Sequence, residues 1–502
     1  MEKVSFCAFL RHCIAIITYL YRRIKTTNIF KYEKIIYSPF LIAAVAAGID
    51  ANSAEVTRIA AGDHTMLLTK DGKIYVSGKN DAGQLGDGHY YDSEVSDNHY
   101  NATTFKPVEK DGVKFRSVTA TLYNSYAIAS DGALYAWGQN AYGQLGLVSV
   151  GTYSGIYTPT KVDDAKWAVV KGRSTTIVGI HTDGTLWAWG KNLTGQLGIG
   201  ADSEMKECAM APEKVSDERW LDCASGYYHS TAVKADGTLW AWGDNSQNQV
   251  NSSTTAIFTT PQQVGEDTDW TQVQAGLKMS AALKADGTLW TWGNNEESAL
   301  GRAVEGKTDG KPMKAFDKVL SYSVGDMHVL VIKDDYTLWG WGYNLHGELA
   351  NGTNRNIDTP TQIGTAQWQT VAAGFYHSVG VQIDGSVWSW GFNRYGQLGL
   401  GDDNNRAELS KVDFNPEEGT VAEIATDSAV KVYPTVAEET ITVSSDATIS
   451  SVSIYNANGQ KVGFKMVDGT QTSLNVSHLA AGTYFVATES GAGKSVARFI
   501  KK

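Results

Sequence analysis

Apolar and polar residues alternate along this chain in short runs that come in pairs. Each pair flanks an Asp-Gly dipeptide or its close copy, which tolerates the positive φ of a tight turn, so each pair predicts an antiparallel β-hairpin. In the unit at 220–243, Trp240 and Trp242 fall on one face of the second strand, with Leu239 and Ala241 on the other. Because both faces are apolar, a neighbouring layer must cover each side of the sheet.

This paired pattern occurs seven times between Ile59 and Gly399. The turn aspartates stand at 71, 131, 183, 236, 286, 335 and 384, so one spacing is 60 residues and the others are 49 to 53. Such a unit holds roughly four short strands, and stacking the sheets into a ring leaves no end face exposed. The pattern therefore predicts an all-β chain with a seven-bladed β-propeller over residues 55–413.

The tryptophans follow the same period. All 15 stand at repeat positions, and ten of them form five Trp-x-Trp pairs. Large aromatic side chains at a fixed repeat phase suit burial between blades, so we expect core packing; aromatic platforms for sugars are the alternative. Gly-Gln-Leu-Gly occurs at 83–86, 143–146, 195–198 and 396–399, and its two glycines around a leucine predict a tight turn with one apolar anchor. It does not indicate a phosphate loop, because no Lys-Ser/Thr follows.

The last repeat carries the most complete motif. It reads Trp-x-x-Val-x-Ala-Gly-x-x-His-Ser at 368–378, then Asp-Gly-x-Val-Trp-x-Trp-Gly-x-Asn-x-x-Gly-Gln-Leu-Gly at 384–399. This pattern resembles the regulator of chromosome condensation repeat, and seven units match in order over about 55–413. The resemblance implies a seven-bladed propeller. Three units depart from the pattern and predict less regular blades: the first has Tyr75 and Ser77 for the Trp pair, the fourth has Asn248 to Asn251 for Gly-Gln-Leu-Gly, and the sixth has Tyr336 for the turn Gly.

A different pattern follows a predicted linker at 414–428. Several short apolar runs separated by turn residues within 429–502 predict a small C-terminal β-sandwich. Val432-Tyr433-Pro434, the segments 454–459 and 479–486, and the closing Arg498–Lys502 resemble the type A sorting domain of the type IX secretion system of Bacteroidota. The resemblance implies that the secretion machinery reads this domain, and that the protein is secreted or held at the outer-membrane surface. An ordinary adhesion-like sandwich is the alternative.

The first 54 residues form a basic leader. They carry seven Lys or Arg against three acidic residues, so the chain's net charge of −11 leaves −15 for the remainder. An apolar run at 35–47 between a basic flank and small residues predicts a secretory signal cleaved near Ser53 or Ala54, with an N-terminal membrane anchor as the alternative. The acidic remainder repels nucleic acid, so we expect no nucleic-acid partner and no chromatin-type activity.

Catalytic and metal-binding motifs are not evident in this sequence. It contains no nucleophile elbow, His-Glu-x-x-His or paired-Cys metal spacing, so we predict no enzyme activity, no catalytic residues, no metal and no cofactor. His64, His229, His328 and His377 share one repeat phase, which predicts a repeated structural hydrogen bond more than a metal ring. Cys208 and Cys223 are the one candidate disulfide outside the leader, and their spacing does not decide whether they pair.

Aromatic residues outside the repeat motif are the best ligand-binding candidates. Tyr90, Tyr91 and Tyr100 lie in the insertion at 86–107, and Tyr123, Tyr227, Tyr228, Phe375 and Tyr376 precede the His/Ser strands of three units. We therefore predict a monomeric binding protein that captures a protein or glycan. An extracellular polysaccharide-acting enzyme or accessory protein with a site in the propeller channel is the alternative.

Overall fold

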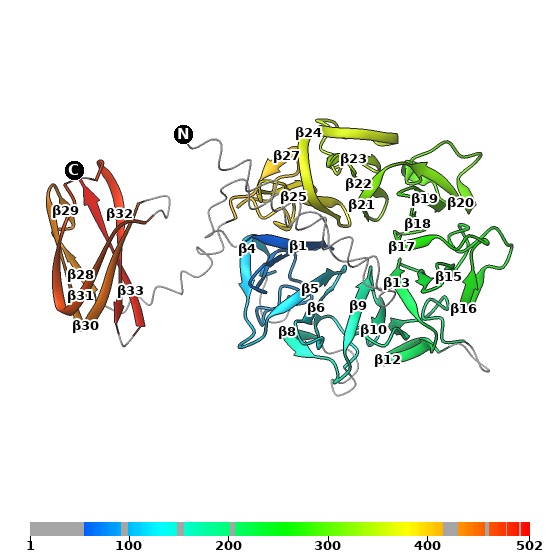
Figure 1. Cartoon of the computed structure of the whole chain (residues 1–502), viewed down its shortest axis with the longest axis horizontal. Helices are drawn as coiled ribbons and strands as arrows, with labels where there is room; N and C mark the ends of the chain where they lie inside the picture. The colour runs from blue at the N-terminus through cyan, green and yellow to red at the C-terminus, as the bar shows by residue number, and fades with distance from the viewer. Residues whose placement is uncertain are drawn as a thin grey trace, which may run out of the picture. The chain divides into compact units, whose positions relative to one another are not determined.

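The computed structural model describes residues 55–91, 99–147, 155–200, 206–414, 430–456, 461–477, 479–490 and 493–502. The predicted leader at 1–54, all but the first residue of the predicted linker at 414–428, and the Asn458-Gly459 turn lie outside these residues. The described residues form a ring of sheets and a C-terminal sheet (Figure 1). Within the described ranges, no helix has the length and apolar character needed to cross a membrane.

Seven antiparallel units of four strands make up the ring, one for each predicted repeat. Blades 1 to 3 are β1 (Val56–Ala61), β2 (His64–Thr69), β3 (Ile74–Gly78) and β4 (Ala102–Val108); β5 (Phe115–Ala120), β6 (Asn124–Ala129), β7 (Leu134–Gly138) and β8 (Ile156–Lys161); and β9 (Trp167–Gly172), β10 (Thr176–His181), β11 (Leu186–Lys191) and β12 (Cys208–Ser216). Blades 4 and 5 are β13 (Trp220–Ser225), β14 (His229–Lys234), β15 (Leu239–Asp244) and β16 (Ile257–Gln263); and β17 (Trp270–Ala275), β18 (Met279–Lys284), β19 (Leu289–Asn294) and β20 (Thr308–Phe316), with a 3-10 turn η2 (Glu296–Ser298) after β19.

Blades 6 and 7 share one long strand. They are β21 (Val319–Val324), β22 (His328–Lys333), β23 (Thr337–Gly342), β24 (Ile357–Ala373), β25 (His377–Gln382), β26 (Val387–Gly391) and β27 (Arg406–Lys411). The first part of β24 pairs with β23 as the outer strand of blade 6, and its last part pairs with β25 as the inner strand of blade 7. The predicted seven-bladed β-propeller is confirmed.

The blades present two different sets of loops. The first strand of each blade borders the middle of the ring (Figure 1). Since neighbouring strands are antiparallel, the connections from first to second strand and from third to fourth strand emerge on the same side, which we call the loop face. The Asp-Gly turns lie on the opposite side, and their glycines adopt the positive φ that the sequence predicts, such as 84° at Gly237.

The two members of each Trp-x-Trp pair have different environments. The second is completely buried between blades, as for Trp189, Trp242 and Trp390, whereas the first is half-buried, as for Trp187 and Trp240. The predicted core packing is therefore confirmed for the second position.

A single backbone carbonyl joins each of several blades to the next one. Between blades 3 and 4, the oxygen of Gln196 in the Gly-Gln-Leu-Gly turn accepts hydrogen bonds from Trp242 Nε1 at 2.9 Å and Ser230 Oγ at 2.8 Å. The same two donors, a Trp and a Ser of the following blade, meet the oxygens of Gln84, Gln249 and Glu348. We call this arrangement the blade junction.

The ring closes through a variant of this junction. Blade 1 has no Trp pair, and the hydroxyls of Thr65 and Ser77 donate instead to the oxygen of Gln397 in blade 7, at 2.7 and 3.3 Å. Hydrogen bonds between blades 1 and 7, from side chains and from backbone, join the two ends of the propeller without a strand shared by the first and last repeats.

The four repeat-phase histidines extend these junctions. His229 Nε2 lies 2.8 Å from Ser280 Oγ of the next blade, and His377 Nε2 lies 2.8 Å from Thr65 Oγ1. Because the Ser280 hydroxyl already donates to Gln249 O, it accepts from the imidazole N–H. His64 and His328 make the equivalent bonds to Ser125 and Ser378. The predicted structural hydrogen bond is confirmed, and it connects blades.

The departures from the repeat do not distort the blades. Asn248 and Tyr336 adopt φ of 59° and 67° where other repeats have Gly, and the Asn248 N–H bonds Asn245 O at 3.0 Å as Gly195 bonds Asn192 O at 3.1 Å. The prediction of less regular blades is therefore wrong for these turns. Surrounding hydrogen bonds fix the backbone path, at a cost of about 1 kcal/mol for each non-Gly residue held at positive φ.

The C-terminal residues form a six-stranded sheet. Its strands are β28 (Val430–Tyr433), β29 (Val436–Ala437), β30 (Thr440–Asn456), β31 (Lys461–Asn475), β32 (Gly482–Ser490) and β33 (Gly493–Lys501). β30 lies between β28 and β32 and also pairs with β31. Ile441, Val452, Val486 and Phe499 are buried together in one core. This folded sheet agrees with the predicted small β-sandwich.

The two cysteines of the propeller are not paired. Cys208 in β12 is half-buried and Cys223 in β13 is buried, and both are free thiols. Burial raises the pKa of the Cys223 thiol well above its ordinary value, so this thiol stays protonated at neutral pH.

The junction predicts a stability change that is specific to its hydroxyl. Replacing Ser280 with Ala removes the bond to Gln249 O and leaves the buried His229 N–H without an acceptor, so we expect unfolding to become easier by about 1–3 kcal/mol. Urea denaturation of the full chain measures this change. The control is Ser252→Ala, at an exposed position of the loop that carries Gln249, which should stay within about 0.5 kcal/mol of the parent. Equal effects of the two substitutions would contradict the role of the junction.

The buried histidines predict a loss of stability in mild acid. Burial lowers the pKa of His229 to about 4 and those of His64, His328 and His377 to about 3, from 6.5. Because protons bind the unfolded chain first, their contribution is complete above pH 6.5 and falls as the pH drops toward 4, by about 1.4 kcal/mol per pH unit for each histidine. Burial raises the pKa of Asp326 to about 6, which offsets part of this slope.

Denaturation midpoints between pH 7.5 and 4.5 measure the slope. The control variant is His229→Asn, because Asn124 occupies the same position in blade 2. It should lose less stability per pH unit than the parent, and parallel curves would contradict the assignment.

Candidate functional site

The loop between the first and second strand of each blade contributes one residue to the centre of the loop face. These residues are Asp63, Leu122, Arg173, Tyr227, Leu277, Asp326 and Phe375, which we call the central ring. Backbone bonds join several neighbours, including Leu122 N–H to Arg173 O at 3.1 Å and Leu277 N–H to Asp326 O at 2.9 Å. The blade architecture therefore brings together residues that are about 50 positions apart in sequence.

One arginine spans this ring from blade 3 to the far side. Arg173 Nε donates to Asp326 Oδ1 of blade 6 at 2.9 Å, while its Nη1 and Nη2 donate to Val324 O at 3.0 Å and Gly374 O at 2.9 Å. Its guanidinium also lies 5.3 Å from the centre of the Phe375 ring. Arg173 and Asp326 are 8% and 2% exposed, so the ion pair is shielded from solvent at the centre of the loop face.

A second contact crosses the centre beside the ion pair. The rings of Tyr227 in blade 4 and Phe375 in blade 7 are 5.6 Å apart in an edge-to-face arrangement. Burial raises the pKa of the Tyr227 hydroxyl far above its ordinary value, so it stays protonated. Phe375, one of the predicted ligand-binding residues, is only 4% exposed and packs against Tyr227 and Arg173.

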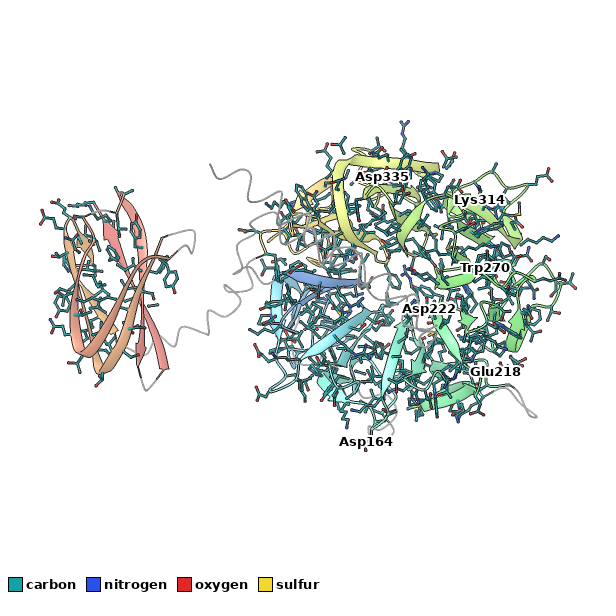
Figure 2. All side chains as sticks on the ribbon, in the orientation of Figure 1. Asp164, Glu218, Asp222, Trp270, Lys314 and Asp335 are labelled. Carbon is teal, nitrogen blue, oxygen red and sulfur yellow. The ribbon has the colours of Figure 1, made fainter. Side chains whose placement is uncertain are left out.

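The inner strands add polar cross-links below the central ring. Figure 2 shows Asp222 near the middle of the propeller, where its carboxylate accepts from Lys171 Nζ at 2.7 Å and from Val273 N–H at 3.0 Å. These bonds join blades 3, 4 and 5. Asp63, whose pKa is raised by burial, is paired with Lys79 at 3.3 Å. Asp222, Asp326 and Asp63 therefore each have a cationic partner.

Five aromatic side chains form a continuous cluster on the loops of blades 6 and 7. They are Tyr343, His346, Tyr376, Phe392 and Tyr395, which we call the blade 6–7 cluster. Tyr376 lies 5.8 Å from Tyr343 and 5.6 Å from His346, measured between ring centres, and Phe392 lies 5.0 Å from His346 and 5.9 Å from Tyr395. All five are half-buried, so each presents part of its ring to solvent.

The cluster is held in place by the repeat. His346 Nδ1 lies 2.9 Å from Oε1 of the buried Glu348, and the backbone oxygen of Glu348 is the acceptor of a blade junction. Lys79 of blade 1 places its ammonium 4.8 Å from the centre of the Tyr395 ring. The half-exposed Leu345 extends the same surface. The cluster therefore reaches from blade 6 to the edge of blade 1.

The predicted binding residues fall into two groups in the structure. Tyr123, Tyr227, Tyr228 and Tyr376 lie on the first loops with Phe375, and Tyr376 is the one that joins the blade 6–7 cluster. In the insertion, Tyr90 stacks on Tyr157 at 4.1 Å, Tyr91 on His99 at 4.2 Å and Tyr100 on His89 at 4.6 Å. Tyr90 is the most exposed of the eight predicted residues, at 38%, and the other seven are half-buried or buried.

Sequence reasoning missed Tyr343, His346, Phe392 and Tyr395. A signal was present: Tyr343 and Phe392 directly precede the Asn of the Asn-x-x-Gly turn, and His346 and Tyr395 directly precede its Gly. Alignment of the repeats shows that aromatic rings occupy both positions only in the sixth and seventh units. The described residues contain no cluster of His, Cys, Asp or Glu arranged to hold a metal ion.

The repeats match known families in the order that the blades follow. The description Regulator of chromosome condensation (RCC1) repeat matches residues 131–172, 183–233, 286–332, 337–381 and 384–423, and a second description of the same repeat matches 56–84, 115–144, 223–249, 270–298 and 368–397. The chain belongs to the regulator of chromosome condensation repeat family.

Several characterised proteins share this repeat. The chain is 30% identical over 213 residues to the Ultraviolet-B receptor UVR8 of Arabidopsis thaliana, covering 42% of the chain and 46% of that protein. It is 27% identical over 230 residues to the Regulator of chromosome condensation of Xenopus laevis, covering 42% and 51%. The matched region thus spans about half the length of each relative.

A solved structure supports the architecture. Prp20p of Saccharomyces cerevisiae superimposes with a TM-score of 0.60 at 21% identity, covering 73% of this chain and 90% of that chain. Identity at this level supports the fold and not a shared ligand.

Residues 431–502 match the description Secretion system C-terminal sorting domain. This protein is therefore a secreted or cell-surface protein of a Bacteroidota-like bacterium.

The ion pair at the centre predicts a strong coupling between opposite blades. Asp326→Asn leaves the Arg173 guanidinium buried without its carboxylate, so we expect a loss of about 3 kcal/mol in unfolding free energy. The double variant R173M/D326N should lose clearly less than the sum of the single changes, as a double-mutant cycle measures. Glu296→Gln, which removes one charge from the exposed Lys307–Glu296 pair, is the control and should change little. Additive single effects would contradict the coupling.

Proposed function

We propose that this protein is a secreted binding protein that captures a protein ligand on the loop face of its propeller. The observation that carries the proposal is the blade 6–7 cluster, where five aromatic rings remain partly open to solvent while contacting one another. A few residues give an interface most of its binding energy, and these are enriched in tyrosine, tryptophan and arginine clustered near the centre of the contact. The cluster therefore supports a recognition surface that has Tyr376 near its middle and Tyr395 at its blade 1 edge.

Rigidity of the supporting loops strengthens this proposal. The Phe392 N–H donates to Tyr376 O at 2.8 Å, and the Tyr343 N–H donates to Met327 O at 2.9 Å, so backbone bonds fix the loops that carry the rings. A ligand meeting a preformed surface loses little protein conformational entropy on binding. This favours capture by a fixed face over folding of a loop around the ligand.

The polar groups at the centre favour binding over catalysis. A glycan-cleaving site needs two carboxylates that are free to act as acid and base or nucleophile. Asp326 is bonded to Arg173 and Asp222 to Lys171, and both also stabilise contacts between blades. We therefore place the polysaccharide-acting alternative second.

The choice of a protein as ligand rests on the family. One relative is named a receptor and another a regulator of chromosome condensation, and the structure of Prp20p is described together with its binding to Gsp1p and histones. We transfer only the class of ligand, a protein met outside the cell, because the sorting domain directs this chain to the surface.

A matched pair of tyrosines tests the proposed surface. Tyr395 and Tyr142 occupy the same position of the Asn-x-Tyr-Gly turn in blades 7 and 2, each with a lysine ammonium 4.8 or 4.9 Å from its ring centre. Only Tyr395 belongs to the blade 6–7 cluster. We expect Tyr395→Ala to raise the Kd for the captured protein at least tenfold, because replacing a residue at the energetic centre of an interface with alanine costs about 2 kcal/mol or more. Tyr142→Ala should change capture less than twofold.

The measurement is photo-crosslinking of the full chain, with a crosslinking amino acid placed at position 395 or 142, followed by binding assays on the captured protein. Melting temperatures of both alanine variants show whether folding is intact. Equal capture by the two variants would contradict the proposed surface. If binding on a glycan panel falls only with Tyr395→Ala, the surface is kept and the ligand is a glycan.

A further inference from the structure

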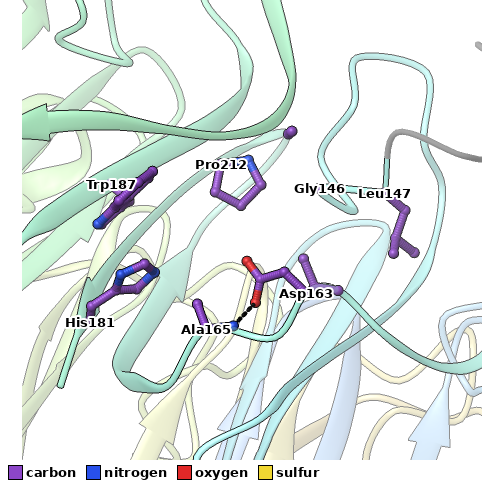
Figure 3. Close-up of a pocket in the computed structure, with 9 residues that line it drawn as sticks. Gly146, Leu147, Asp163, Ala165, His181, Trp187 and Pro212 are labelled. Atoms are coloured by element: carbon purple, nitrogen blue, oxygen red, sulfur yellow. Dashed lines mark hydrogen bonds between the residues drawn. The ribbon is translucent and has the colours of Figure 1, made fainter.

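A pocket of about 460 Å³ lies between blades 2 and 3, beside the outer strand β12 (Figure 3). Its walls are largely apolar and include Leu147, Val162, Ala165 and Pro212, and its polar groups come from Asp163 and His181. This volume falls in the range of small-ligand sites. The site is built from strands and interblade connections, so it does not rest on the proposed function of the loop face.

Three of the other blades place a lysine at this position, whereas blades 1, 2 and 7 have Thr69, Ala129 and Gln382 there. The last residue of the second strand is Lys234 in blade 4, Lys284 in blade 5 and Lys333 in blade 6, but His181 in blade 3. The N–H groups of His181 and Lys234 donate to the oxygens of Thr185 and Thr238 at 3.1 and 3.0 Å, which confirms that the positions are equivalent. Blade 3 therefore replaces a long cationic side chain with a shorter ring.

In blades 4 and 5 the lysine ammonium lies between aromatic rings and acidic residues. Lys284 Nζ is 4.8 Å from the centres of both Trp270 and Trp290, and it forms ion pairs with Asp267 at 2.7 Å and Asp269 at 3.1 Å. Lys234 similarly lies over Trp240 at 3.7 Å and pairs with Glu218. These blades thus supply their own cation to a site formed by tryptophan and carboxylate.

Blade 3 keeps the tryptophans and the acid, but its nearest ammonium, Lys214 Nζ of β12, lies 5.4 Å from the centre of the Trp187 ring and pairs with Asp217 instead of Asp163. The His181 ring packs 4.2 Å from the centre of the Trp167 ring and 4.6 Å from that of Trp187. Asp163 Oδ1 accepts from Ala165 N–H and Trp167 Nε1, both at 3.1 Å, and its second oxygen points into the pocket in Figure 3. Within the described residues, Asp163 has no Lys or Arg partner within ion-pair distance. The carboxylate therefore faces the pocket without a counter-ion.

The electrostatics around the imidazole also favour a cation. The negative charges of Asp163 and Asp183 favour a positive charge at His181. Lys214 opposes this effect, and its ammonium is paired with Asp217 at 2.8 Å. His181 Nε2 is buried and has no hydrogen-bond partner. Burial lowers the pKa of His181, so its neutral ring can offer a nitrogen lone pair. The pocket thus combines apolar walls with one carboxylate that has no cationic partner in the part of the chain that the structure describes.

We propose that this pocket binds a small organic ammonium ion, whose apolar body packs against Pro212 and Leu147 and whose N–H groups bond the Asp163 carboxylate beside the His181 ring. The ligand supplies to blade 3 the positive charge that Lys234 and Lys284 supply to blades 4 and 5. Apolar contact determines the size of the body, and the carboxylate selects the charge.

The test uses the full chain and three probes of equal shape: cyclohexylammonium, cyclohexanol and cyclohexanecarboxylate. Ligand-observed NMR and calorimetric titration measure binding. We expect cyclohexylammonium to bind at least tenfold more tightly than cyclohexanol, and cyclohexanecarboxylate not to bind. Asp163→Asn should weaken the ammonium at least tenfold.

The sharpest variant is His181→Lys, which gives blade 3 the residue of blades 4 to 6. It should fold with a melting temperature equal to or above that of the parent while losing ammonium binding. Asp164→Asn is the charge-matched control, because Asp164 is next to Asp163 in sequence, its side chain is 99% exposed, and Figure 2 shows it at the outer edge. This control should bind normally. The proposal is overturned if the parent does not bind cyclohexylammonium, if the neutral probe binds equally, or if His181→Lys and Asp163→Asn both bind like the parent.

Discussion

The backbone oxygen at the second position of the Gly-Gln-Leu-Gly turn is the acceptor on which the ring depends. It is buried, and in four junctions it receives one N–H from a tryptophan and one O–H from a serine of the next blade. A buried carbonyl left without donors loses its hydration and gains nothing in return, so neighbouring blades must keep their register. Sheet packing alone gives area but little angular precision. The two bonds to one oxygen define how far each blade is rotated against the next.

The same turn also determines what the loop face can present. In blade 7 the side chain of Asn393 accepts from Leu398 N–H at 2.9 Å and holds the turn closed, while Arg394 and Tyr395 inside it face outward without a role in the junction. Asn344 and Leu349 repeat this arrangement in blade 6 around Leu345 and His346. Because the carbonyl and the Asn side chain keep the backbone fixed, the two residues between them can vary without loss of the fold. The residues of the blade 6–7 cluster are therefore carried by a backbone that buried hydrogen bonds hold fixed.

Blade 3 departs from the other blades at two places that do not contact each other. Arg173 is the one cationic residue of the central ring and reaches Asp326 across the centre, and His181 stands where blades 4 to 6 have a lysine and lines a pocket at the outer side. One change fills space in the middle of the ring, and the other opens space near its edge. Arg173 finds its carboxylate partner in blade 6, whereas the buried Nε2 of His181 has no hydrogen-bond partner among the described residues.

The sequence by itself determined the repeat, the hairpins, the number of blades and the C-terminal sheet, because these follow from local periodicity and from turn residues with restricted φ. It also indicated that His229 and its equivalents are structural, since other repeats place Asn or Met there. It failed where contacts join residues from different repeats. Phe375 was predicted to bind a ligand and is buried against Arg173, and Tyr395 was overlooked although it lies beside Lys79, more than 300 residues away. Only ring closure decides such contacts, because it brings blades 3, 6 and 7 to one centre and blade 7 to blade 1, and no local pattern encodes that proximity.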